Sequence, residues 1–241
     1  MMKDGERRRQ GDKENSLTES SPCLPLSLSP CLFRGAIILC GGHSTRMGRD
    51  KALLPFGAES LLQRVVRIVA EVVPAERIVC VAAQGQTLPA LPDGVRIIRD
   101  PFPDCGPLAG LATGLQVLDG EVDAAFVCGC DVPLLLPPFI ERMFELCGSH
   151  QIAVVHDGER SHPLCAVYRS DMRRAAEEIL AAGGRSLMAL VDACDSIRVT
   201  PEQVRDVDSD LRSLAACNTP DEYERLRILD CGLRIGENEE S

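Results

Sequence analysis

The segment 35–51, GAIILCGGHSTRMGRDK, constrains this 241-residue chain more than any other part of it. The apolar run over residues 36–40 predicts a buried β-strand. Gly41 and Gly42 follow, and because glycine has no Cβ, the backbone can turn tightly there and approach a ligand. Free backbone N–H groups in such a turn form a concavity that binds anions. The segment therefore predicts an anion site at the end of a buried strand.

Two cationic side chains specify the anion further. Arg46 offers a planar guanidinium and Lys51 a compact ammonium, and both groups suit phosphates. The spacing excludes the commoner phosphate loops: five residues separate Gly42 from Gly48, Arg49 comes next, and no G-x-G-x-x-G occurs. We predict a nucleoside triphosphate site that is neither a P-loop nor a dinucleotide fingerprint.

Composition limits the class of protein. A chain of 241 residues with 45% hydrophobic residues can form one α/β domain with a sizeable core. No apolar run reaches the length of a membrane span, so we expect no membrane partner. The net charge of −10 argues against non-specific binding of nucleic acid. An anionic substrate is still compatible, because basic residues near the first strand act locally.

The twelve cysteines are scattered rather than arranged as a disulfide framework. Cys40, Cys80 and Cys165 lie inside apolar runs, as small hydrophobic residues do in a reducing cytosol, so we expect a cytoplasmic protein. Cys128 and Cys130 form a lone C-x-C, which is a weak metal signal. Buried thiols at a strand end are the favoured interpretation.

From Gly35 onward, strand patterns alternate with helix patterns, whereas residues 1–33 are first polar and then interrupted by prolines. We expect a disordered extension over 1–33, a domain over 34–230 and a disordered tail over 231–241. Alternation of this kind predicts an α/β fold: a single three-layer α/β/α domain with a mostly parallel sheet. The expected strands are 77–82, 95–98, 124–128, 152–155, 164–168 and 197–199, besides the first. The expected helices are 60–72, 107–118, 138–147, 170–182, 186–194 and one from 219.

Two aspartates follow predicted strands, at the edge where open α/β sheets bind ligands. Asp131 ends a buried strand, where a carboxylate is costly unless it is paired or bound to a metal. Mg²⁺ binds through few carboxylates plus substrate phosphates, so Asp131 is the strongest candidate metal ligand. A turn or helix-cap aspartate is the alternative. Asp100 precedes Pro101, and Asp-Pro is also an ordinary turn signal.

The first segment resembles the L-x-G-G-x-S-x-R-M-G-x-D-K signature of nucleotidyltransferases with a Rossmann-like fold. The residues that fill it are Leu39, Gly41, Gly42, Ser44, Arg46, Met47, Gly48, Asp50 and Lys51. The chain is most similar to the molybdenum cofactor guanylyltransferase (MobA) family. The resemblance extends over about residues 35–229 and includes the Cys-Asp-Val-Pro segment around Asp131 and the Gly-Pro-Leu-Ala-Gly segment from Gly106.

A second segment, residues 156–163 with the sequence HDGERSHP, resembles the H-D-G-E-R-x-H-P stretch of the same family. Its histidines lack helical metal-site spacing and Pro163 stops a helix, so we expect a hairpin loop. The resemblance implies that this loop and Asn218, in an N-T-P segment, face a pterin acceptor. The implied acceptor contacts are His156, Asp157, Gly158, Arg160, His162 and Asn218. The sequence departs from the family at Ala216, where a second Asn is common, and within 81–83, where an Asn associated with the nucleotide is replaced.

The resemblance implies transfer of GMP from GTP to Mo-molybdopterin with release of pyrophosphate. Arg46, Lys51 and Asp131 are implied to act in catalysis. The implied nucleotide contacts are Leu39, Cys40, Gly41, Gly42, Lys51, Asp100, Gly106, Pro107 and Asp131. Asp131 and Asp100 are implied to hold Mg²⁺.

Three questions stay open at this point. The nucleotide could be CTP rather than GTP, or the acceptor a sugar phosphate or isoprenoid. The chain could instead be a non-catalytic module that binds nucleotide and delivers cofactor. The segment from Gly106 could read the base or simply pack closely at a helix N-terminus. The family also implies transient contact with molybdoenzymes or cofactor-supply proteins.

Overall fold

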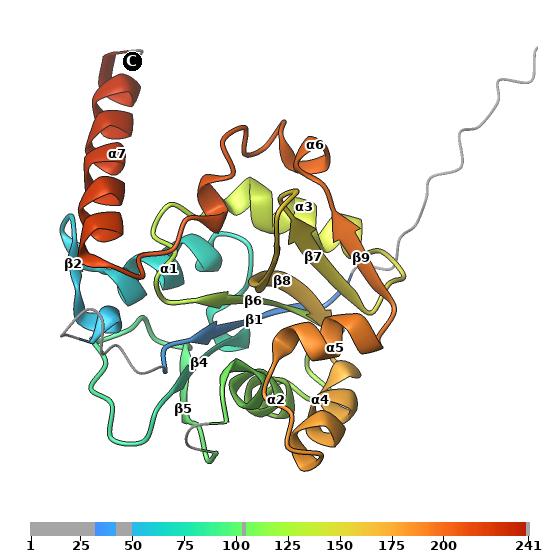
Figure 1. Cartoon of the computed structure of the whole chain (residues 1–241). Helices are drawn as coiled ribbons and strands as arrows, with labels where there is room; N and C mark the ends of the chain where they lie inside the picture. The colour runs from blue at the N-terminus through green and yellow to red at the C-terminus, as the bar shows by residue number, and fades with distance from the viewer. Residues whose placement is uncertain (1–31, 42–49, 103–104, 240–241) are drawn as a thin grey trace, which may run out of the picture. The chain divides into compact units, whose positions relative to one another are not determined.

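A computed structural model describes residues 32–41, 50–102 and 105–239, with the side chains of 233–239 left aside. Within these residues the main sheet has seven strands in the order β5-β4-β1-β6-β8-β7-β9 (Figure 1). The strands are β1 (Arg34–Leu39), β4 (Ile78–Ala82), β5 (Arg96–Arg99), β6 (Ala124–Gly129), β7 (Ile152–His156), β8 (Ser161–Arg169) and β9 (Ser196–Val199). The expected extension over 1–33 lies almost wholly outside the described residues.

The sheet is mostly parallel, as predicted. β1 pairs in parallel with β4 and β6, β4 pairs in parallel with β5, and β7 pairs in parallel with β9. β8 is inserted between β6 and β7 and runs antiparallel to both. This insertion follows from the short connection between β7 and β8, because a tight hairpin can join only antiparallel neighbours.

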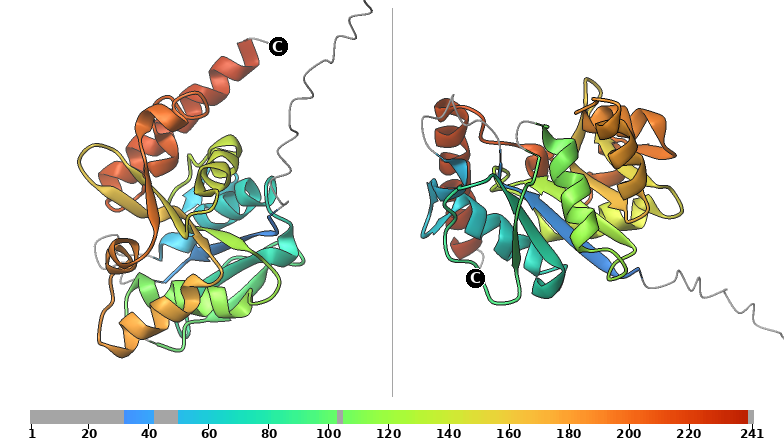
Figure 2. Two further views of the ribbon diagram at one scale, coloured as in Figure 1. Left: turned by 90° about the vertical axis from the view of Figure 1, so that its right-hand side faces the viewer. Right: turned by 90° about the horizontal axis from the view of Figure 1, so that it is seen from below.

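Helices cover both faces of the sheet, so the three-layer prediction is confirmed (Figures 1 and 2). The helices on one face are α1 (Leu61–Ala70), α3 (Pro137–Cys147) and the short α6 (Pro201–Val204). Those on the other face are α2 (Pro107–Val117), α4 (Met172–Ala181) and α5 (Leu187–Ala193). β1 shows why both layers are needed. Ala36 and Ile38 pack in the core on the α1 side of the sheet, and Ile37 and Leu39 pack in the core on the α2 side. A strand that is apolar on both faces is stable only between two layers.

A small second sheet, absent from the prediction, precedes α1. β2 (Pro55–Phe56) pairs with β3 (Glu59–Ser60) through a turn in which Gly57 has φ 68°. Ser60 then begins α1 with a capping box, in which its hydroxyl accepts from Gln63 N. Strands of two residues each are too short to show an alternating pattern, which explains why the hairpin was missed.

The domain boundary predicted at residue 230 falls within α7 (Pro220–Glu239). Asp230 connects this helix to the rest of the domain. Its side chain is buried and forms an ion pair with Arg64 of α1. Arg64 Nε also donates to the Pro133 carbonyl at 2.7 Å, so the pair attaches α7 to the domain.

This ion pair leads to a stability prediction. Asp230→Ala should lower the free energy of unfolding by about 3 kcal/mol, because removing one partner leaves a buried charge poorly compensated. Glu224→Ala, on the same helix with a side chain 57% exposed, should change it by less than about 0.5 kcal/mol. Chemical denaturation of both variants measures the difference. Equal losses in the two would show that the buried pair does not hold the helix.

Candidate active site

The candidate site lies at the carboxyl edge of the sheet, where the strand order reverses. The chain continues from β1 outward to β4 and β5 and later returns to β6 on the other side of β1. Such a switch point is where open α/β sheets bind ligands. Leu39 and Gly129 are register partners at the ends of β1 and β6. Gly41 and Asp131, two residues further along each strand, therefore lie at the same level on either side of this crevice.

Three predicted residues from distant parts of the chain meet here. Lys51 Nζ lies 2.6 Å from Asp131 Oδ2 and 3.1 Å from Asn218 Oδ1. The side chains of Lys51 and Asp131 are 18% and 19% exposed, so the ion pair is largely shielded but reachable from solvent. The resemblance placed Lys51 at the phosphates and Asn218 at the acceptor. The structure brings the two into one cluster.

Local hydrogen bonds hold the partners of this cluster in place. Asp50 caps the short 3-10 helix η2 (Lys51–Leu53), since its Oδ1 accepts from Ala52 N at 3.0 Å. Asn218 precedes α7, and its backbone N–H donates to Glu222 Oε2 at 2.8 Å. Glu222 also accepts from Thr219 N at 3.0 Å, and its own N–H donates to Thr219 Oγ1, so the two residues form a capping box.

Asp131 has the chemistry expected of a magnesium ligand. Its backbone carbonyl accepts from Cys217 N at 2.8 Å, which leaves the carboxylate directed to Lys51. Among the described residues, no group of three or more His, Cys, Asp or Glu side chains could hold a metal. Mg²⁺ does not require one, because it commonly binds through one or two carboxylates together with phosphates and waters. A single carboxylate beside a predicted phosphate site therefore fits Mg²⁺.

That Asp100 shares a metal ion with Asp131 stays a prediction. Asp100 follows β5, which β4 and β1 separate from β6. Three strand spacings amount to about 14 Å, so the two strands that precede these aspartates are well separated. Asp100 Oδ1 accepts from Phe102 N at 2.9 Å. Burial raises the pKa of the Asp100 carboxyl above its usual value, against the opposing effect of that hydrogen bond. A contact of Asp100 with the nucleotide stays a prediction.

The segment from Gly106 begins α2, with Pro107 in its first turn. Gly106 has φ 74°, and a Cβ there would lie 3.0 Å from the Arg185 carbonyl oxygen, so only glycine fits. Gly110 lets α2 approach β1, since a Cβ would lie 2.9 Å from Leu39 Cδ2. Close packing at a helix N-terminus is thus confirmed for this segment. Contact of Gly106 and Pro107 with the base stays a prediction.

The sulfur of Cys40 points into the core. Hydrogen bonding with Cys130 and Cys80, together with burial, raises the pKa of the Cys40 thiol well above its usual value. The side chains of Cys40 and Leu39 both belong to the core, and contact of either residue with a nucleotide stays a prediction. Cys128 and Cys130 are buried free thiols, as expected. Gly42 and Arg46 lie outside the described residues, so their roles stay predictions.

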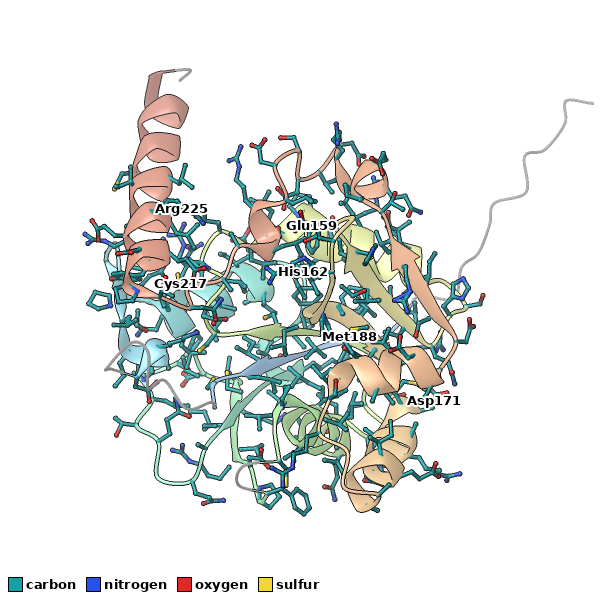
Figure 3. All side chains as sticks on the ribbon, viewed as in Figure 1. Glu159, His162, Asp171, Met188, Cys217 and Arg225 are labelled. Atoms are coloured by element: carbon teal, nitrogen blue, oxygen red, sulfur yellow. The ribbon has the colours of Figure 1, made fainter. Side chains whose placement is uncertain are left out.

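The HDGERSHP segment is the predicted hairpin between β7 and β8. Cys128 of β6 pairs with Cys165 of β8 in antiparallel register, and continuing this register brings Asp131 level with His162. The hairpin thus lies at the same edge of the sheet as the Lys51 cluster. Figure 3 labels His162 on this hairpin and Cys217, which precedes Asn218 at the start of α7.

Asp157 organises the hairpin. Its Oδ1 accepts from the backbone N–H of Glu159 and Arg160, each at 2.9 Å, and its Oδ2 lies 2.5 Å from His162 Nε2. Gly158 adopts φ 99° in the turn. Gly158 and Arg160 are exposed and His162 is half-buried. Exposed groups at the tip and a fixed imidazole behind them form a surface that could contact an acceptor.

His156 lies apart from the Asp157–His162 pair. Its Nδ1 is 3.3 Å from Ser161 Oγ, at the base of the hairpin. Asp157 and His162 instead bind each other. Contact of His156 with a substrate stays a prediction.

Sequence comparison identifies the family of this chain. A family model described as a MobA-like NTP transferase domain matches residues 36–196. The chain belongs to this family. A probable molybdenum cofactor guanylyltransferase of Mycobacterium avium is 39% identical over 189 residues, which cover 74% of this chain and 93% of the relative. A Mycobacterium tuberculosis protein of the same name is 37% identical over 189 residues, 76% of this chain and 91% of its own.

Structural comparison agrees on the fold. The crystal structure of molybdopterin-guanine dinucleotide biosynthesis protein A from Archaeoglobus fulgidus superposes with a TM-score of 0.68 at 20% identity. The match covers 83% of this chain and 99% of that one. The Rossmann-like nucleotidyltransferase architecture predicted from the motifs is therefore confirmed. In the described part of the chain, no helix combines the length and apolar character needed to cross a bilayer.

The hairpin contacts lead to a prediction about acid stability. Hydrogen bonds from Arg160 N, His162 and Glu159 N hold the pKa of Asp157 well below its usual value. Below about pH 4 the unfolded chain takes up this proton before the folded chain does. The stability that Asp157 contributes is therefore present near neutral pH and is lost as the pH falls.

Asp157→Asn should lower the thermal midpoint clearly at pH 6, and the difference from the parent protein should shrink by pH 3. Thermal unfolding followed by circular dichroism over this range measures it. Asp171→Asn, at the start of α4 where the side chain makes no capping bond, is the control. A difference of the same size at both pH values would contradict the proposed role of the carboxylate.

Proposed function

We propose that this protein transfers GMP from GTP to Mo-molybdopterin, forming molybdopterin guanine dinucleotide and releasing pyrophosphate. The observation that carries the proposal is the meeting of Lys51, Asp131 and Asn218 at the switch point of the sheet. The predicted triphosphate residues and the predicted acceptor residues thus lie at one edge. A transferase that joins two phosphorylated substrates needs this arrangement.

The nucleotide half of the site works mainly by electrostatics. Phosphoryl transfer requires positioning and charge stabilisation rather than covalent help from the protein. Lys51 would present its ammonium to the phosphates, and the glycine-rich motif that begins at Gly41 would supply backbone N–H groups. Arg46 adds a second cation from the same motif. These groups would favour the charge that builds on the departing pyrophosphate.

Asp131 would hold Mg²⁺ in this site. The bound ion would neutralise phosphate charge that Lys51 and Arg46 leave uncompensated. In the described structure Lys51 forms an ion pair with Asp131, so the carboxylate already has a cationic partner before substrate arrives. When a triphosphate binds with Mg²⁺, Lys51 would turn to the phosphates, and the metal ion would then compensate the charge of Asp131.

The acceptor half needs no strong general base. The terminal phosphate of the pterin is already anionic near neutral pH and can attack the α-phosphorus of GTP directly. Asp157 fixes the ring of His162, so that its orientation does not have to be selected on binding. Asn218 connects the acceptor half to the nucleotide half, because its carboxamide oxygen accepts a hydrogen bond from Lys51. These residues would orient the acceptor phosphate toward the nucleotide.

Support for the guanine base comes from the relatives, whose names specify guanylyl transfer. A cytidylyltransferase would use the same phosphate machinery and differ near Gly106. A non-catalytic binding module would have no use for a metal carboxylate beside the phosphates. The described cysteines are free thiols, which fits a protein of the reducing cytoplasm. We propose that the product is transferred to molybdoenzymes in the same compartment.

The nucleotide assay tests the proposal directly. With Mo-molybdopterin and Mg²⁺ present, we expect pyrophosphate release from GTP and little from CTP, ATP or UTP. Release with CTP but not GTP would overturn the guanylyl assignment. Binding of GTP without pyrophosphate release from any nucleotide would favour the binding module.

Two substitutions separate the roles of the ion pair. Asp131→Asn should lower Mg²⁺-dependent turnover at least a hundred-fold, about 2.7 kcal/mol of transition-state stabilisation, with the fold retained. Lys51→Ala should instead raise the Kd for GTP about ten-fold, because it removes a phosphate contact. Steady-state kinetics and calorimetric titration of GTP measure the two effects. Near-normal turnover of Asp131→Asn would contradict the metal role of Asp131. Unchanged GTP affinity of Lys51→Ala would contradict the phosphate role of Lys51.

A further inference from the structure

A glutamine in the loop after β4 makes three hydrogen bonds that connect separate parts of the candidate nucleotide site. Gln86 Oε1 accepts from Ala83 N at 3.0 Å. Its Nε2 donates to the Cys40 carbonyl and to Asp50 Oδ1, each at 3.0 Å. Both hydrogens of the side-chain amide are therefore used, and each bond goes to a different segment of the chain.

The two acceptors lie near the two ends of the diagnostic motif, which extends from Leu39 to Lys51. Cys40 directly precedes Gly41, and Asp50 directly precedes Lys51. Asp50 Oδ1 also accepts from Ala52 N, so the carboxylate that receives the Gln86 bond is the one that begins η2. Through these bonds, Gln86 fixes the distance between the end of β1 and the helix that carries Lys51.

Gln86 is itself firmly held. Arg99 Nη1 donates to the Gln86 carbonyl at 2.7 Å and to the Ala83 carbonyl at 3.1 Å. Gly85 takes φ 71° between them, which lets the loop turn back toward β1. Gln86 is half-buried, whereas its neighbours Gly85 and Thr87 are exposed. The side chain thus reaches inward from a loop that β5 supports.

We infer that Gln86 is a positioning residue for the triphosphate of the nucleotide. The inference rests on the proposed function and extends it to a residue outside the recognised motifs. Phosphate recognition by backbone N–H groups and an ammonium depends on their mutual spacing, and small displacements reduce it strongly. Gln86 maintains that spacing by joining the backbone before Gly41 to the carboxylate before Lys51.

The discriminating variant is Gln86→Glu. It keeps the size of the side chain and the acceptor for Ala83 N, but it loses both donors and places a carboxylate against Asp50. We expect the Kd for GTP with Mg²⁺ to rise at least ten-fold, with the KM for the pterin acceptor changed less than two-fold. Gln86→Leu, which removes the bonds without adding charge, should raise the Kd for GTP about five-fold.

Gln151→Glu is the matched control. Gln151 precedes β7 at the opposite edge of the sheet, and its Oε1 accepts from Asp195 N at 3.0 Å, a bond that glutamate can keep. Its GTP affinity should equal that of the parent protein. Circular dichroism and thermal unfolding of all variants confirm that the fold is retained.

A double-mutant cycle tests whether Gln86 acts through the lysine. In a Lys51→Ala background, Gln86→Leu should raise the Kd for GTP less than two-fold, because the ammonium it positions is gone. Wild-type affinity of both Gln86 variants, or the same factor in both backgrounds, would overturn the inference alone. A parent protein that binds no GTP would overturn the inference together with the proposed function. A parent that binds GTP without turnover would count only against the proposed function.

Discussion

The ion pair between Lys51 and Asp131 is the interaction on which the rest of the site depends. It joins the helix that follows β1 to the turn that follows β6, across the crevice where the strand order reverses. Asn218 adds the start of α7 to the same cluster. Because the carboxylate is largely shielded, it is stable there only with a cationic partner. Before substrate binding, the ammonium provides that partner.

This arrangement explains how an acidic protein can bind two anionic substrates. The net charge is −10, yet the cations that matter are concentrated where the strands end. The Asp157 carboxylate of the hairpin is already engaged, since it accepts two backbone N–H bonds and contacts His162. The remaining polar contacts, including those of Gln86, serve to hold donors at fixed positions. Preorganised donors of this kind contribute most in phosphoryl transfer.

Much of the fold and part of the site could be predicted from local pattern. Apolar runs identified the strands and helices of the main domain, and the motif around Gly41 identified Lys51. What local pattern could not provide has physical causes. The hairpin of β2 and β3 has strands too short to show a period. Strand order places β4 and β1 between the strands that precede Asp100 and Asp131. Asp230 of α7 pairs with Arg64, a contact between residues 166 positions apart.

The sequence by itself determined which segments become strands and helices, and which side chains can bind phosphate and metal, because periodicity and residue chemistry are local properties. Only the tertiary structure decided which of those side chains meet. Asn218 joined Lys51, Asp100 was separated from Asp131, and Gln86 proved to connect the two ends of the opening motif. These outcomes depend on strand order and on hydrogen bonds across many intervening residues, which form only when the sheet is assembled.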